Sequence, residues 1–238
     1  MQTIYTPKGR AYEYAPLALN IYSGCSHHCT YCYMRPMVER FKGAGSFDTP
    51  VYREGLLEAL EKLLDRSDCS YYGKTIHLCF SCDPYPAGID TTPTREVIQM
   101  LRRYGCHVQI LTKGGTMAQR DFDLLDDQDW FGVTMTTIEP SKIEPGAALP
   151  HERLGSLSRA KLDGIKTWVS FEPVYDTEAV YTAIRSGGWI DRLRIGKLNY
   201  FPSDIAWGAF GWECDRLAKE YGRNIYIKED LRREMERT

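Results

Sequence analysis

The chain has 238 residues, of which 43% are hydrophobic and 26% are charged, an ordinary composition for a globular protein with a sizeable core. No run approaches the roughly 18 consecutive apolar residues that span a membrane, and the first ten residues lack the apolar stretch of a secretory signal. The chain has eight cysteines and no export signal, which predicts a reducing cytoplasm as its location. Without an apolar span, no membrane partner is expected. The net charge of −2 excludes a global attraction to nucleic acid and leaves only local basic clusters.

Apolar strands alternate with amphipathic helices along the chain. Strands are expected at residues 17–22, 75–81, 107–111, 130–137, 166–171, 192–198 and 224–227. Helices are expected at residues 54–64, 94–103, 119–125, 152–162, 177–185 and 207–221, with Asp176 as an N-cap. Strands separated by helices at this rhythm require right-handed crossovers and a parallel sheet. The chain is therefore expected to be an α/β protein with too few units for a closed eight-stranded barrel.

Three cysteines lie within eight residues directly after the first strand: Cys25, Cys29 and Cys32. Three thiolates on one loop can hold three irons of a cubic iron–sulfur cluster, which leaves the fourth iron without a protein ligand. An iron without a protein ligand indicates a catalytic cluster rather than one that only transfers electrons.

Zinc is the competing interpretation of these cysteines. His27 or His28 could complete a set of four tetrahedral ligands, but both lie between the cysteines on the same loop, where four ligands can hardly face one ion. A second version pairs Cys29 and Cys32 with Cys79 and Cys82, across a stretch far longer than the roughly 15–20 residues of a zinc ribbon.

Polar or thiol side chains end each of the first six strands, whereas the middles of the strands are apolar. In parallel α/β barrels the reacting groups sit at the C-terminal ends of the strands. The strand-end residues are Cys25; Ser81, Cys82 and Asp83; Thr112 and Lys113; Thr136, Thr137 and Glu139; Ser170 and Glu172; Lys197 and Asn199. We therefore expect the functional site at this edge of the sheet.

The spacing Cys-x3-Cys-x-aromatic-Cys, with Tyr31 before the last cysteine, resembles the signature of the radical S-adenosylmethionine (SAM) superfamily. This resemblance implies that Cys25, Cys29 and Cys32 bind a [4Fe–4S] cluster, that SAM chelates the open iron, and that Tyr31 lies near the adenine. It also implies an open, partial (β/α)6 barrel and an external reductant of the flavodoxin or ferredoxin type. The expected organisation is a single domain over residues 1–238, with the cluster loop at 24–34, the barrel core at about 17–200, and a C-terminal helix and short strand within 205–238.

The functional groups of SAM suggest partners among the strand-end residues. Lys113 is a natural ion-pair partner for the carboxylate, and Ser81 or Ser170 can add hydroxyl donors. Ribose hydroxyls favour acceptors such as Glu139 or Glu172. Asp83 and Thr136 complete the expected cofactor-binding set. The alternative is that such residues only cap the following helices, Asp83, Thr137 and Ser170 above all.

Several runs resemble the spore photoproduct lyase-like branch of the superfamily, namely residues 7–10, 14–20, 83–85, 168–173 and 195–199. In the lyase after which this branch is named, a 5′-deoxyadenosyl radical takes hydrogen from a thymine dimer in DNA, and a cysteine after the second strand returns a hydrogen atom. The resemblance makes Cys82 the candidate hydrogen donor, although the order of Cys, Ser and Asp over residues 79–83 differs from the lyase pattern. Lys197 and Asn199 join it as catalytic candidates, and Cys79 is expected to be structural.

The resemblance implies a nucleic acid base as the substrate. A peptide or a nucleotide-like small molecule is the alternative for the same chemistry. A non-catalytic module that binds zinc or an iron–sulfur cluster is the alternative from another class.

Overall fold

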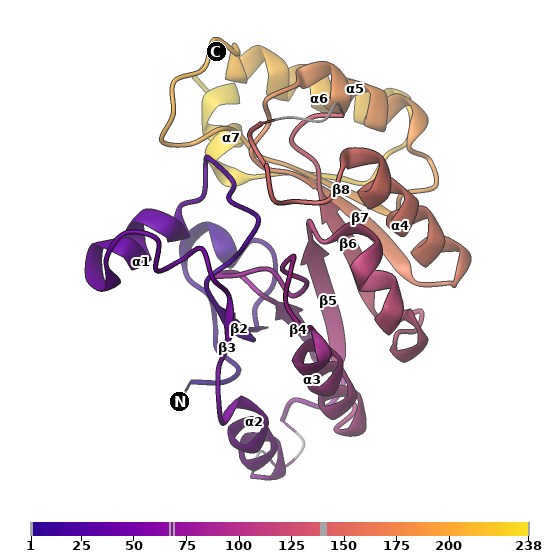
Figure 1. The fold of residues 1–238 in the computed structure, drawn as a ribbon. Helices are drawn as coiled ribbons and strands as arrows, with labels where there is room; N and C mark the ends of the chain where they lie inside the picture. Colours follow the sequence, from indigo (N-terminus) through magenta and orange to yellow (C-terminus); the bar gives the residue numbers. More distant parts are fainter. Residues whose placement is uncertain (1, 67, 69, 139–141, 238) are drawn as a thin grey trace.

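Seven parallel strands form the central sheet of the computed structural model, which describes residues 2–66, 68, 70–138 and 142–237 (Figure 1). The strands are β1 Ala18–Leu19, β4 Thr75–Leu78, β5 His107–Thr112, β6 Trp130–Thr134, β7 Lys166–Phe171, β8 Arg192–Ile195 and β9 Ile225–Ile227. Their order across the sheet is β1-β4-β5-β6-β7-β8-β9, and each neighbouring pair is parallel. The order follows the chain from one edge to the other, so the sheet is an open barrel wall.

The helices flank the sheet: most lie between successive strands and cover its outer side, whereas the first stands apart and the last follows the final strand (Figure 1). They are α1 Met34–Lys42, α2 Leu56–Asp65, α3 Thr92–Arg103, α4 Pro150–Leu162, α5 Thr177–Ser186, α6 Trp207–Glu220 and α7 Glu229–Met235, with 3₁₀ helices at Gly9–Ala11 and Gly115–Leu124. The expected cap of α5 is confirmed, because the Asp176 carboxylate accepts a hydrogen bond of 3.1 Å from the Ala179 N–H. No helix in the described ranges is both long enough and apolar enough to cross a bilayer.

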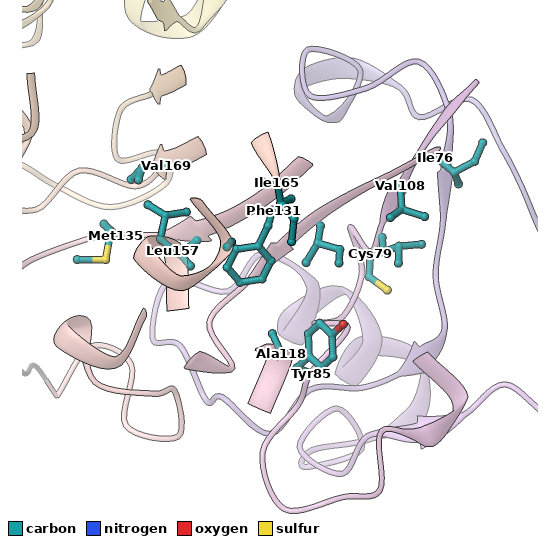
Figure 2. Close-up of a cluster of buried hydrophobic side chains, with 14 of the residues drawn as sticks. Ile76, Cys79, Tyr85, Val108, Ala118, Phe131, Met135, Leu157, Ile165 and Val169 are labelled. Atoms are coloured by element: carbon teal, nitrogen blue, oxygen red, sulfur yellow. The ribbon is translucent and has the colours of Figure 1, made fainter. Parts of the chain in front are cut away.

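The core lies between the sheet and these helices. Figure 2 shows one part of it, where Phe131 of β6 and Val108 of β5 lie among side chains such as Leu157 of α4. Strands β5, β6 and β7 are buried along most of their length: their centres are apolar, and polar residues such as Gln109 and Ser170 are buried with them. Gly132 is required in β6, because a Cβ there would lie 2.2 Å from Nε1 of Trp168, whose indole donates to the Ile110 carbonyl.

The observed boundaries correct several expectations. The strand expected at 17–22 is divided into β1 and β2 Tyr22–Ser23, and β2 pairs with β3 Val51–Tyr52 in a separate antiparallel ribbon. The helix expected at 119–125 is the 3₁₀ helix Gly115–Leu124, and neither α1 nor α7 was expected. Since β9 is the seventh strand of the sheet, the barrel wall continues past residue 200.

Three strands end earlier than expected, at Leu78, Thr134 and Ile195. The polar groups assigned to these strand ends therefore lie on the loops that follow. In the first case the reason is a side chain: Oδ1 of Asn20 accepts hydrogen bonds from the Phe80 and Ser81 N–H groups. Because a side chain meets the hydrogen-bonding need of these backbone groups, the strand does not have to continue.

Candidate active site

A cavity of about 470 Å³ opens at the C-terminal edge of the sheet, bounded by the cluster loop and by loops that follow β4, β5, β7, β8 and β9. Its lining includes nearly all of the residues expected at the site. These are Cys25, Cys29, Tyr31, Cys32, Ser81, Cys82, Asp83, Lys113, Ser170, Glu172, Lys197 and Asn199. The parallel topology accounts for this convergence, since the carboxyl ends of all seven strands meet at one edge.

Two expected residues are not part of this lining. Thr136 is buried, and its carbonyl accepts a hydrogen bond from the Tyr175 N–H. Thr134, the last residue of β6, lines the cavity in its place, because the chain leaves the strand direction after this position. Glu139 lies outside the described residues.

The cluster loop presents three free thiols to the cavity. Cys25, Cys29 and Cys32 are each partly exposed, and burial is the main cause that raises the thiol pKa of Cys25 and Cys29. The loop reverses at Gly24, whose φ of +92° and missing Cβ allow its Cα to approach the Thr49 carbonyl. These thiols must lose their protons when a metal binds.

The three thiols are not drawn together as they would be around a bound zinc ion. A zinc ion binds thiolates at about 2.3 Å, which draws its ligands close together. Among the described residues, three such ligand atoms lie within 4.8 Å of one another only in a group on β5 and the loop before β6, so the three cysteine sulfurs are farther apart than this. A cubic cluster, in contrast, binds each thiolate at a different iron.

The histidines of the loop are directed to other partners. Nδ1 of His27 lies 3.4 Å from the Asp83 carboxylate, and Nδ1 of His28 lies 3.4 Å from Asp48. Among the described residues, neither histidine lies with the three thiols in one group within 4.8 Å.

Asp83 connects the cluster loop to the sheet. Its buried carboxylate accepts hydrogen bonds from the Thr112 hydroxyl (2.6 Å) and from the backbone N–H groups of Lys113 (2.9 Å) and Tyr85 (2.8 Å), in addition to the contact with His27. Burial alone would raise the pKa of this carboxyl, but His27 and the hydrogen bonds outweigh it and lower the pKa to about 2. With its acceptor positions used in this way, Asp83 holds the wall of the cavity; it does not cap the next helix, since α3 begins at Thr92.

The aromatic ring before the last cysteine is held by a buried ion pair. The Tyr31 hydroxyl donates to Glu144, which is paired with Arg153 at 2.6 Å. Lys113 places its ammonium 5.7 Å from the centre of the Tyr31 ring. Burial lowers the pKa of Lys113, but the Cys29 thiol and Glu144 outweigh this effect and raise it, so the ammonium stays charged.

Glu144 and Arg153 were not expected in the site. Glu144 lies in an irregular loop, where no periodic pattern identifies it. Arg153 lies four residues before Leu157 on the buried face of α4, so helical spacing places its charge inward, and this local signal was overlooked.

A second network of polar side chains forms another part of the cavity wall. One carboxylate oxygen of Glu172 accepts hydrogen bonds from the Tyr14 hydroxyl (2.5 Å) and the Lys228 ammonium (2.6 Å). The Tyr14 hydroxyl also lies 2.7 Å from that of Ser170, and Lys228 is only 1% exposed. Tyr14 and Lys228 line the cavity but were not predicted; Lys228 follows β9, and applying the strand-end rule to that last strand would have found it.

The three catalytic candidates lie on two loops of the cavity. Cys82 is partly exposed, and its thiol is in hydrogen-bond contact with the buried Cys79 thiol. Lys197 is paired with Glu234, and the Asn199 amide donates to Asp230 at 2.7 Å. Helix α7 thus holds both Lys197 and Asn199.

Solved structures with the same arrangement identify the fold. Over 93% of this chain and 78% of the other, the structure matches spore photoproduct lyase complexed with dinucleoside spore photoproduct, with a TM-score of 0.66 and 14% sequence identity. The chain has the fold of spore photoproduct lyase. A mutant of that enzyme with bound AdoMet and dinucleoside spore photoproduct matches 92% of this chain and 63% of its own, with a TM-score of 0.61 and 16% identity. SuiB of Streptococcus suis bound to S-adenosylmethionine matches 89% of this chain and 50% of its own, with a TM-score of 0.60 and 12% identity.

These matches confirm the open parallel α/β barrel expected from the sequence, and the expected likeness to spore photoproduct lyase at the level of the fold. No model of a known protein family matches the chain. Among curated proteins, an uncharacterized protein of Acidianus two-tailed virus is 29% identical over 174 residues, which are 68% of this chain and 57% of that protein. An uncharacterized protein of Mycobacterium tuberculosis is 29% identical over 168 residues, 66% of this chain and 48% of its own. The chain spans about half the length of the curated relatives it matches.

Proposed function

We propose that this chain is a radical SAM enzyme that holds a [4Fe–4S] cluster on Cys25, Cys29 and Cys32. The observation that carries the proposal is the convergence of these three thiols with polar side chains from five further loops on one cavity, in the fold of spore photoproduct lyase. A volume of about 470 Å³ is within the range of small-molecule sites, roughly 300–1,000 Å³. All seven cysteines that the structure describes are free, in agreement with a reducing cytoplasm.

When bound, the cluster supplies the electron that reductively cleaves SAM to a 5′-deoxyadenosyl radical, and this radical abstracts hydrogen from the substrate. The chain's own part is to bind and orient. We assign Lys113 to the SAM carboxylate, because in the described part of the chain no carboxylate lies within 4.0 Å of its ammonium. Glu172 is assigned to the ribose hydroxyls: Tyr14 and Lys228 hold one of its oxygens, and no hydrogen bond from the described residues reaches the other.

Other lining residues complete this assignment. Ser81 and Ser170 add hydroxyl groups, and Tyr31 is held in place for the adenine by Glu144. Cys82 is the candidate hydrogen donor to the substrate, because its thiol is the more exposed of the two thiols after β4. Lys197 and Asn199 lie at the side of the cavity formed by the loop after β8, where they can contact a substrate.

We propose a nucleic acid base as the substrate. Lys8 and Arg10 line the cavity, and Tyr200 is 82% exposed, with the Arg10 guanidinium 5.1 Å from the centre of its ring. Cations with exposed aromatic rings are the elements that bind phosphates and unstacked bases. The alternative is a peptide or a nucleotide-like small molecule. The net charge of −2 favours this alternative, because it gives the chain no overall attraction to a nucleic acid.

The cluster and the SAM chemistry are tested by anaerobic reconstitution with iron and sulfide, followed by dithionite reduction in the presence of SAM. We expect about four irons per chain, an absorption band near ~400 nm, and 5′-deoxyadenosine by chromatography. Cys29→Ala should lose all three signals, whereas Cys106→Ala, which removes a buried thiol far from the cavity lining, should keep them. A colourless wild-type protein with about one zinc and no nucleoside product contradicts the proposal and favours the non-catalytic module.

The substrate class is tested separately by a gel shift with a single-stranded oligonucleotide at several salt concentrations. Phosphate contacts make the affinity fall with salt, and Arg10→Ala should weaken binding and reduce this slope by about one unit. Lys219→Ala, on the exposed surface of α6, is the matched control. Binding that is absent or insensitive to salt argues for the peptide or small molecule.

A further inference from the structure

Helix α1 carries an exposed apolar stripe next to the cluster loop. Tyr33, Met37 and Phe41 are spaced four residues apart, so their side chains lie on one face of the helix. They are 48%, 56% and 84% exposed, and no residue of α1 is buried. Figure 1 shows α1 standing out from the body of the molecule. A helix that turns its large apolar side chains to solvent marks an interaction surface.

The charges at the end of this stripe are positive. Arg40 and Lys42 are exposed on either side of Phe41. The one acid of the helix, Glu39, is directed to the backbone and accepts a hydrogen bond of 2.9 Å from the Gly45 N–H. The α1 face, defined as Tyr33, Met37, Arg40, Phe41 and Lys42, is thus an apolar strip with a basic end.

This face begins at the proposed cluster. Tyr33 directly follows Cys32, its hydroxyl donates to the Phe80 carbonyl, and Met34 of the first helical turn lines the cavity. With a rise of 1.5 Å per residue, Phe41 lies about 12 Å along the helix from Tyr33. A protein seated on the face would have its contact surface next to the thiols of the cluster loop.

We propose that the α1 face is the docking surface for a small acidic one-electron carrier of the flavodoxin or ferredoxin type. This inference rests on the proposed function, in which the cluster must receive one electron per cleavage; the carrier's reduced cofactor loses that electron and the cluster gains it. Aromatic residues, Met and Arg are enriched in protein–protein interfaces, and redox encounters are small, below about 1,200 Å². A basic rim steers an acidic partner and speeds its encounter.

The composition of the face favours a protein over a nucleic acid. Affinity for nucleic acid comes mainly from neutralised phosphates, and the face offers two cations, Arg40 and Lys42, at one end only. Its centre is Met37, an unbranched apolar side chain that suits an adaptable protein contact.

The experiment compares two reductants on the reconstituted, full-length chain. Cluster reduction is followed by the loss of absorbance near ~400 nm, with either flavodoxin hydroquinone or dithionite as the electron source. The test variants are Met37→Asp with Phe41→Asp, and Arg40→Glu with Lys42→Glu. The control is Leu162→Asp, which adds the same charge at an 82% exposed position of α4.

We expect both test variants to lower the flavodoxin rate by at least about tenfold and to leave the dithionite rate unchanged. The charge-reversed variant should also lose the salt dependence of the flavodoxin rate. Leu162→Asp should match the wild type. In a second readout that needs no cluster, the wild-type chain should bind immobilised flavodoxin and both test variants should bind it at least about tenfold more weakly.

Several outcomes would overturn the proposal. Unchanged flavodoxin rates would do so, and so would a dithionite rate that falls equally, because α1 would then only support the cluster loop. Loss of oligonucleotide binding with the flavodoxin rate intact would make the face a nucleic acid surface instead. If the wild-type chain forms no cluster and gives no nucleoside product with dithionite, the proposed function itself is wrong. That result comes from the wild type alone and is therefore distinguishable from a result of the α1 variants.

Discussion

Asp83→Asn is the most informative single substitution, because Asp83 joins the cluster loop to the loops after β4 and β5. Every contact of the carboxylate comes from a donor: the Thr112 hydroxyl, the backbone N–H groups of Lys113 and Tyr85, and Nδ1 of His27. An amide has one oxygen and one NH₂ group. In either orientation the NH₂ group of the asparagine would face donors and leave them unpaired.

Two independent arguments give the size of the effect. Each buried donor left without an acceptor costs about 1–3 kcal/mol. The pKa of Asp83, lowered from 3.8 to about 2, corresponds to about 2 kcal/mol of stabilisation of the charged form in the folded state. Both describe the same contacts and are not added, so we expect Asp83→Asn to lower the free energy of unfolding by about 2–4 kcal/mol at pH 7.

Urea unfolding as a function of pH measures this effect. Because the folded-state pKa is below the unfolded one, the stabilisation by Asp83 is complete above about pH 4 and is lost as the pH falls towards 2. The difference in unfolding free energy between wild type and Asp83→Asn should therefore narrow over that range. Asp204→Asn, at an exposed position, should show no difference at any pH.

The reasoning is refuted if the free energy of unfolding of Asp83→Asn at pH 7 lies within about 0.5 kcal/mol of the wild-type value, the range of ordinary surface substitutions. A difference that stays constant down to pH 2 would also refute it, because the contribution would then not depend on the charge of Asp83.

Three further substitutions test other parts of the structure. Lys228→Met leaves the Glu172 carboxylate without its cation and should cost about 3 kcal/mol, measured by urea unfolding. Gly132→Ala forces a Cβ against the indole of Trp168, at 2.2 Å, and should cost about 1–3 kcal/mol with a change in tryptophan fluorescence. Burial lowers the pKa of His77 from 6.5 to about 3. The free energy of unfolding of the wild type should therefore decrease as the pH falls from 6.5 to 3, by up to about 1.4 kcal/mol per pH unit. His77→Gln should remove this contribution to the slope.

Matched controls separate these effects from general damage. Lys219→Met removes an exposed lysine and should change the unfolding free energy by less than about 0.5 kcal/mol. Gly155→Ala, in the interior of α4 with no atom within 4 Å of the added Cβ, should stabilise by about 0.5–1 kcal/mol. His151→Gln, at an exposed position, should keep the wild-type slope between pH 6.5 and 3. Should Gly132→Ala stabilise as Gly155→Ala does, or His77→Gln keep the slope, the packing or the burial argued for these sites is wrong.

The alternation of strands and helices is readable because its causes are local. A buried strand needs an apolar centre, such as Trp168 and Val169 in β7, and β7 occupies the six residues predicted for it. Helices α2 and α3 show the spacing of apolar residues that face a core. Helix α1 was missed although Tyr33, Met37 and Phe41 have helical spacing; this stripe faces solvent, and no residue of the helix is buried in the core.

The sequence predicts the candidate site only as far as the topology of the sheet determines it. Once the strands are known to be parallel, their carboxyl ends must share one edge, and this rule gathered the cluster cysteines with Lys113 and Glu172. It failed at Thr136, because the strand ends at Thr134, three residues earlier than expected, and it stopped short of Lys228, because β9 was treated as a remnant.

By itself, the sequence determined the class of fold, the cysteine loop and the edge of the sheet where polar groups gather, since each follows from spacing along the chain. Tertiary structure alone decided which charges neutralise one another: Arg153 with Glu144 beside Tyr31, and Lys228 with Glu172 beneath Tyr14. The physical reason is that burying a charge is tolerable only with a partner at hydrogen-bond distance. Such partners come from whichever segment the closing sheet brings near, however far away it is in the chain.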